Sequence, residues 1–92
     1  MTTIVYQRSP AILFGDIGDD VVALSVARGL CYGMENVSAV VWNLLEQPRA
    51  IDDICERLLE LYEVDAARCR GEVAALLEEM RAEGLIEAGP VS

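Results

Sequence analysis

Histidine and lysine are absent from this 92-residue sequence, and all seven basic residues are arginines. Without histidine, the chain lacks the side chain that most often serves as a general base or a metal ligand. It also lacks an apolar run of about 18 residues, so we expect no membrane-spanning helix. The first nine residues contain no basic region followed by an apolar one, which is not typical of a secretory signal.

Positive charge is scarce, because sixteen acidic residues stand against the seven arginines and give a net charge of −9. Binding to nucleic acid needs a basic patch that replaces the counterions on phosphates, and an anionic membrane attracts the same kind of patch. We therefore expect neither nucleic acid nor a membrane among the partners. The acidic charge is instead suited to a partner with basic residues, whose association it would accelerate.

Cysteine is also sparse, with Cys31, Cys55 and Cys69 as the three examples. Their number is odd, and no pair has the spacing typical of a zinc site. We expect small buried hydrophobic residues in a reducing cytoplasm, without a metal site or a disulfide framework. A reactive thiol is the alternative, but the sequence holds no histidine to activate one.

Hydrophobic residues make up 53% of the chain, which excludes disorder and predicts one small core. We interpret residues 1–92 as a single domain, with residues 1–9 as a candidate flexible tail. Three short segments are typical of strands, at residues 12–14, 21–26 and 30–34. Gly29 lies between the last two segments and favours a tight hairpin connection, because glycine readily takes positive φ.

The second half of the chain has a helical period. A first helix is expected to begin at Glu35 or Asn36 and to end near Gln47, because Pro48 cannot continue it. A second helix is expected over residues 51–62, and a third over residues 66–83, with Asp65 as its N-cap and Gly84 as a left-handed C-cap. The fold class is therefore α+β and winged-helix-like, with a three-stranded antiparallel sheet followed by three helices.

No catalytic constellation emerges from the sequence. The carboxylates fall in adjacent pairs such as Asp52-Asp53 and Glu78-Glu79, and neighbouring residues on a helix point in different directions. A serine nucleophile would have no histidine, and the glycines do not form a phosphate loop. We predict no enzyme activity, no catalytic or metal-binding residue, and no cofactor.

Two features favour binding. The segment 30–34 comes last in a small sheet, where an edge strand could pair with an extended peptide. The helix over residues 66–83 carries a strip of small, apolar and basic residues, at Ala66, Arg70, Ala74, Leu77 and Arg81. This strip could line a peptide groove, or it could simply be the polar boundary of a core helix.

Residues 30–86 resemble the PqqD-like family of recognition elements for ribosomally made, modified peptides. The family has a glycine turn and aromatic strand, an Ile-Trp-x-Leu-Leu helix, a Pro-Arg turn, a Leu-x-x-x-Tyr-x-Val segment and a final Gly-Leu-hydrophobic. The matching residues are Gly29, Tyr32 and Met34; Val41-Trp42-Asn43-Leu44-Leu45; Pro48-Arg49-Ala50-Ile51; Leu58, Tyr62-Glu63-Val64-Asp65; and Leu76-Leu77 with Gly84-Leu85-Ile86. Their order and spacing agree with the family pattern over about two-thirds of the chain.

Three positions depart from that pattern. Glu35 replaces an asparagine before the first helix, with Asn36 available as the cap, and Ser38 replaces a glycine. Ala50 replaces a capping threonine, which is expected to cost the second helix about 1 kcal/mol. These changes affect stability and leave the expected peptide groove unaltered.

The resemblance implies a non-catalytic protein that binds the leader segment of a precursor peptide as an antiparallel strand. By position, Leu30, Cys31, Tyr32, Gly33 and Met34 would pair with the leader, and Cys69, Arg70, Val73, Ala74 and Leu77 would form the helix wall. A stand-alone domain of this size resembles the partner of a lasso-peptide leader protease. The protease would be a separate cytoplasmic protein, with the cyclase as a further candidate partner.

Four alternatives remain open at this point. The chain could assist a radical-SAM modifying enzyme, or it could be an adaptor or dimerisation domain. It could also be an enzyme subunit, or a winged-helix DNA-binding regulator. The regulator would read DNA with residues 66–83, whose three arginines are outnumbered by glutamates. An unpaired strand edge also leaves open whether the chain is a monomer or a strand-exchanged dimer.

Overall fold

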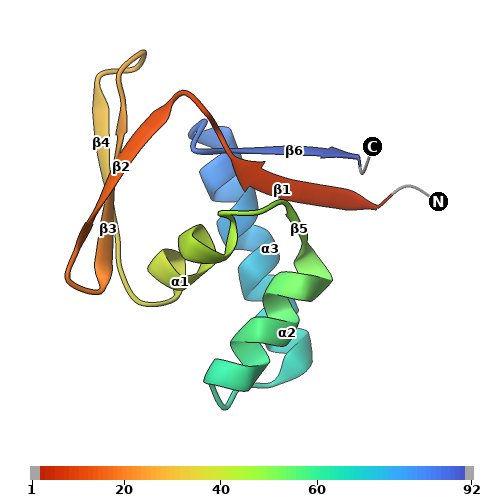
Figure 1. The fold of residues 1–92 in the computed structure, drawn as a ribbon. Helices are drawn as coiled ribbons and strands as arrows, with labels where there is room; N and C mark the ends of the chain where they lie inside the picture. The colour runs from red at the N-terminus through yellow and green to blue at the C-terminus, as the bar shows by residue number, and fades with distance from the viewer. Residues whose placement is uncertain (1–2, 91–92) are drawn as a thin grey trace.

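The computed structural model describes residues 3–90, which form three helices and six strands (Figure 1). The elements in chain order are β1 (Ile4–Arg8), β2 (Ile12–Ile17), β3 (Asp20–Ser25), β4 (Leu30–Met34), α1 (Val37–Leu44), β5 (Arg49–Ala50), α2 (Ile51–Leu61), α3 (Ala66–Ala82) and β6 (Ile86–Pro90). No helix within this range is long and apolar enough to cross a membrane. The α+β class is therefore confirmed, whereas the winged-helix likeness stays a prediction.

The expected antiparallel sheet is present, with the strand order β2-β3-β4. Its register places Ile12 opposite Ser25 on one side of β3, and Val21 opposite Met34 on the other. The connection before β4 contains Gly29 at a φ of 64°, a left-handed conformation that glycine adopts without the cost of a Cβ. The hairpin predicted from this glycine is therefore confirmed.

A second antiparallel sheet, with the order β5-β1-β6, was missed in the sequence (Figure 1). Residues 4 to 8 pair with residues 86 to 90, and Val5 also pairs with Ala50. The interpretation of residues 1–9 as a flexible tail therefore fails for β1, while residues 1 and 2 lie outside the described range. Pairing between the two ends of a chain leaves no local signal, and neither β1 nor β6 has a complete alternating pattern by itself.

Both ends of α3 follow the local sequence, whereas Asn36, the expected cap of α1, makes no side-chain cap hydrogen bond. Asp65 caps α3 by accepting a hydrogen bond from the Arg68 backbone N–H at 3.0 Å, as predicted. After α3, Gly84 has a φ of 77°, and the N–H groups of Gly84 and Leu85 donate to the carbonyls of Arg81 and Met80. These two bonds form a Schellman motif, which turns the chain into β6. By contrast, α1 ends at Leu44, three residues earlier than expected.

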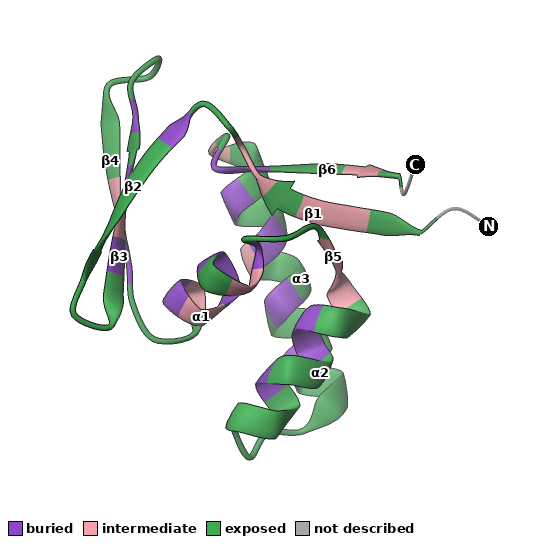
Figure 2. Ribbon diagram, viewed as in Figure 1, coloured by how far each residue is buried: buried purple, intermediate pink, exposed green. Residues whose placement is uncertain are grey.

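The core lies between the β2-β3-β4 sheet and the helices (Figure 2). Its largest fully buried side chains come from β3, from all three helices and from the residue after α1, and they are Trp42, Leu45, Ile54, Leu77, Val21 and Val41. Arg8 covers one side of this core, where its guanidinium lies 4.9 Å from the centre of the Trp42 ring and 4.5 Å from the centre of the Phe14 ring. Its Nε also donates to the Trp42 carbonyl at 3.0 Å, which ties β1 to α1.

Candidate functional site

Strand β4 lies at the edge of its sheet. It pairs with β3, and no strand within residues 3–90 pairs with its other side. Along an antiparallel strand, alternate residues turn their N–H and C=O groups toward one neighbour, so half of the β4 backbone is directed at the open side. These groups are available to a further strand.

The side chains of β4 alternate between the two faces of the sheet, as predicted. Met34 is buried and Tyr32 is half-buried on the core side, whereas Cys31 and Gly33 are exposed on the other. Leu30 belongs to the core-side set but is exposed at the end of the strand. A Cβ placed on Gly33 would meet no atom within 4 Å, so the backbone of β4 is accessible there.

Glu83, at the end of α3, anchors the β3–β4 hairpin. Its carboxylate accepts hydrogen bonds from the Tyr32 hydroxyl at 2.8 Å and from Arg28 at 3.2 Å, and Arg28 also donates to the Glu83 carbonyl at 2.7 Å. Partial burial and the bond to Glu83 raise the pKa of Tyr32. Because the phenol stays protonated at neutral pH, it remains a donor, and the distance between β4 and α3 is held.

A groove with a volume of 130 Å³ lies between β4 and α3. Its β4 side is formed by Tyr32, Gly33 and Met34. Its α3 side is formed by Leu76, Glu79, Met80 and Glu83, while Ser38 and Leu85 complete the lining. This groove distinguishes the edge at β4 from an ordinary exposed strand, because an added strand would also contact a helix.

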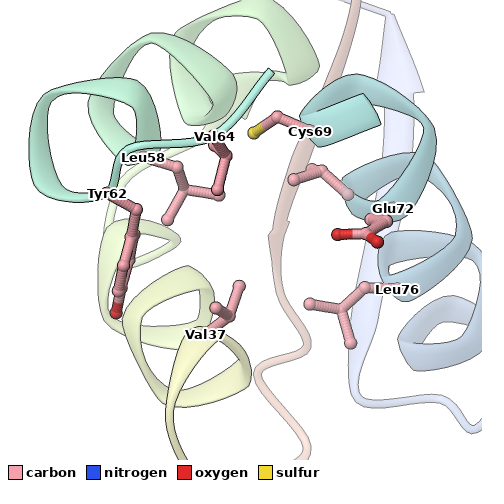
Figure 3. A pocket seen from close by; sticks show the side chains of 8 residues that line it. Val37, Leu58, Tyr62, Val64, Cys69, Glu72 and Leu76 are labelled. Carbon is pink, nitrogen blue, oxygen red and sulfur yellow. The ribbon is translucent and has the colours of Figure 1, made fainter. Parts of the chain in front are cut away.

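A second, larger cavity of 280 Å³ lies among the start of α1, the end of α2 and the first turns of α3. Figure 3 shows its side chains, which are Val37, Leu58, Tyr62, Val64, Cys69, Glu72, Val73 and Leu76. Glu72 is the only charged side chain among these lining residues. Leu76 borders both this cavity and the groove, so the two hollows adjoin along α3.

The structure divides the predicted helix wall between two sides of α3. Cys69 and Val73 border the larger cavity but are mostly buried, and Leu77 is fully buried in the core. Arg70 forms an ion pair with Asp52 of α2, so it turns toward α2. Ala74 lies one helical turn further along the same side. These five residues do not form one surface opposite β4.

The residues of α3 that do lie opposite β4 were missed. Leu76, Glu79 and Glu83 follow one another at intervals of three or four residues, which places them along one stripe of the helix, and Glu72 continues this stripe beside the larger cavity. The pattern was visible in the sequence, but glutamates on a helix are usually solvent-facing. Nothing local indicated which polar flank of the core stripe would turn toward the strand edge.

The three cysteines differ in their surroundings. Cys55 and Cys69 are buried between α2 and α3, as expected, whereas Cys31 is exposed on β4, so the expectation of burial is wrong for Cys31. Burial, together with the neighbouring Cys69 thiol, raises the pKa of Cys55. A thiol with a raised pKa is protonated and unreactive at neutral pH, as expected for a cysteine that serves the core. No cluster of metal-ligating side chains occurs within the described range.

Comparison with known proteins identifies relatives of this arrangement. The family model described as Coenzyme PQQ synthesis protein D (PqqD) matches residues 20–86. The structure of TbiB1 in complex with the TbiA(beta) leader peptide has a TM-score of 0.83 and 26% sequence identity, over 88% of this chain and 94% of that chain. Lasso peptide synthetase B1 complexed with the leader peptide has the same fold, with a TM-score of 0.77 and 22% identity, over 89% of this chain and 96% of that chain. No curated protein matches the chain.

Proposed function

The chain belongs to the PqqD family, and we propose from this membership and from its open strand edge that it binds the leader segment of a ribosomally made precursor peptide. Binding would be non-catalytic, and the chain would present the leader to a separate enzyme. The leader peptide bound to the similar TbiB1 supports this function.

The observation that carries the proposal is the open side of β4 facing α3 across the groove. An extended peptide added there would form main-chain hydrogen bonds with β4, while alternate side chains would enter the groove. Main-chain pairing supplies affinity for many sequences, so selectivity must come from the groove. On the α3 side of the groove, Leu76 would favour an apolar side chain of the peptide, and the carboxylates of Glu79 and Glu83 would favour a basic one.

The direction of β4 suggests what lies at each end of the peptide. Within β4, Tyr32 hydrogen-bonds to Glu83 at the end of α3. After the end of β4 at Met34, the chain reaches Val37, which borders the larger cavity. An antiparallel peptide would therefore begin near this cavity and end near the hairpin turn. We propose that the cavity receives an apolar side chain from the segment that precedes the paired strand.

The pathway and the partners are part of the same proposal. The lasso-peptide leader protease is the proposed recipient, with the cyclase as a second one, and the cytoplasm is the proposed compartment. A radical-SAM enzyme remains the alternative recipient. The carboxylates along the groove would repel the phosphates of DNA, which disfavours the regulator.

The experiment is a titration of the isotopically labelled chain with a synthetic leader peptide from the neighbouring precursor gene. Amide shifts should be confined to β4, α3 and the cavity. Leu76→Lys should weaken binding by about tenfold or more, because it places a charge where an apolar side chain is expected. Ala74→Lys, on the other side of α3, should change it by less than about twofold.

Glu79 provides a second variant that leaves the core untouched, since its side chain is exposed. Glu79→Lys should weaken binding of a leader with a basic residue at the facing position. If the leader causes no shifts at saturating concentration, leader binding is wrong. If Ala74→Lys weakens binding as strongly as Leu76→Lys, the groove has been placed on the wrong side of α3.

A further inference from the structure

The face of the β2-β3-β4 sheet that points away from the helices is apolar. An antiparallel sheet with one face on the core usually carries polar residues on the other. Apart from Asp20 at one end of β3, the outward positions are Leu13, Gly15 and Ile17 on β2, Val22 and Leu24 on β3, and Cys31 and Gly33 on β4. Leu13 is 59% exposed, Ile17 64% and Leu24 40%. We call these seven residues the outer face.

The outer face is continuous across all three strands. Leu24 lies opposite Leu13 on one side and Cys31 on the other, and Val22 lies opposite Gly15 and Gly33 in the same way. The two glycines have open space where a Cβ would stand, so Val22 is flanked by bare backbone. Figure 2 shows that most of β2 and β4 is exposed. Contiguous apolar surface of this kind is typical of an interaction site.

One end of the outer face is acidic. A hollow of 260 Å³ there is lined by Ile17, Val22 and Gly33, together with Asp20 and Glu35. Neither carboxylate takes part in a salt bridge within residues 3–90, where all five ion pairs involve other acidic residues. A surface that covers the outer face would therefore gain from a lysine or arginine at this end.

We propose that the outer face docks a second protein, whose apolar surface carries a basic residue that reaches Asp20 and Glu35. A second copy of this chain fits less well, because each copy carries a net charge of −9 and copies repel one another. This inference rests on the proposed function, since the docked protein is the enzyme that receives the leader.

The groove and the outer face share β4, and this links peptide binding to docking. A peptide strand added to β4 extends the sheet, and alternate side chains of the peptide lie on the outer face beside Cys31 and Gly33. The docked protein contacts both the chain and the peptide, so it binds the complex more tightly than the free chain. By linkage, it strengthens peptide binding by the same factor.

The test measures the affinity of the proposed leader protease for the full chain, with and without the leader peptide. Leu24→Asp places a charge at the centre of the outer face and should weaken protease binding by about tenfold or more. Asp20→Lys reverses the charge at the acidic end and should also weaken it. Leu61→Asp, on α2, is the control, because Leu61 is 58% exposed and is not one of the residues of the outer face.

Leader affinity is measured for every variant. If Leu24→Asp and Asp20→Lys keep the leader affinity within about twofold and lose the protease, docking on the outer face is supported. If both variants bind the protease as tightly as the wild type does and still bind the leader, the docking site is overturned and the proposed function stays intact. If the wild-type chain does not bind the leader, the proposed function itself is overturned. A dimer in sedimentation that Leu24→Asp dissociates assigns the face to a second copy and also overturns the inference.

Discussion

Tyr32 shows how one side chain positions the strand edge. It lies on the core side of β4, and its hydroxyl donates to Glu83 in the last turn of the helical region, 51 residues away in sequence. Arg28 meets the same carboxylate from the hairpin turn, at 3.2 Å. The two contacts hold the β3–β4 hairpin against α3, and the groove width depends on them.

Tyr32→Phe is therefore expected to lower both stability and leader affinity while leaving the core packed. The ring keeps its apolar contacts, but Glu83 loses one of its two donors. Urea unfolding and the leader titration measure the two effects. A Phe variant with wild-type values in both measurements would show that the hydroxyl has no part in holding the hairpin.

The raised pKa of Tyr32 also predicts that stability depends on pH, and Tyr32→Phe tests this. Partial burial and the bond to Glu83 raise the folded-state pKa of Tyr32 above its ordinary value of 10.0. As pH rises, the unfolded chain loses this proton first, so the contribution to stability is present below about pH 10 and is lost as pH rises through the folded-state pKa. Urea midpoints measured up to about pH 11 should fall more steeply for the wild type than for Tyr32→Phe. Equal slopes would contradict the raised pKa.

At the scale of elements, the helix ends are uneven in quality. The Asp65 side chain caps α3, whereas the N-cap position of α2 is Ala50, whose φ of −77° and ψ of 160° suit an N-cap but whose side chain has no acceptor. Asp52 and Asp53 in the first turn of α2 compensate in part, because carboxylates there interact favourably with the helix dipole.

Ala50→Ser is expected to raise the free energy of unfolding by about 1 kcal/mol, since it supplies the missing acceptor to the first turn of α2. Asp65→Ala is the converse, and it should lower the free energy of unfolding by about 1 kcal/mol. Urea unfolding measures both. If Ala50→Ser gives no gain while Asp65→Ala gives the expected loss, the pairing of residue 50 in β5 with Val5 in β1 holds the serine side chain away from the helix.

Elements with a local signal were predictable and the others were not. The β3–β4 hairpin was indicated by alternation and a glycine, and α3 by its period and both of its ends. Strands β1 and β6 were missed, because each stabilises the other across the whole chain and neither has a complete pattern alone. In the site, β4 was predicted correctly as an edge, whereas Arg70 and Ala74 of the predicted helix wall do not line the groove beside it.

At the scale of the whole molecule, the net charge of −9 is expected to speed the encounter with a basic leader. Raising the salt concentration from about 0.05 M to about 0.5 M should lower leader affinity several-fold, mainly through the association rate, because exposed charges are screened. Stopped-flow measurements over this range test it, and Glu79→Lys should show a weaker salt dependence. Affinity that stays constant with salt would leave the charge a role in solubility alone.

The sequence by itself determined the absence of histidine chemistry, the acidic charge, the single core, the hairpin and the three helices. These properties follow from composition and from patterns a few residues long, which act locally wherever the chain lies. Only the tertiary structure decided that Leu76 and Glu79, and not Arg70 and Ala74, face β4, because the rotation of α3 about its axis is set by packing against α2 and β6. It also decided that the apolar outward residues of three strands meet in one face, since strand register joins them across the chain.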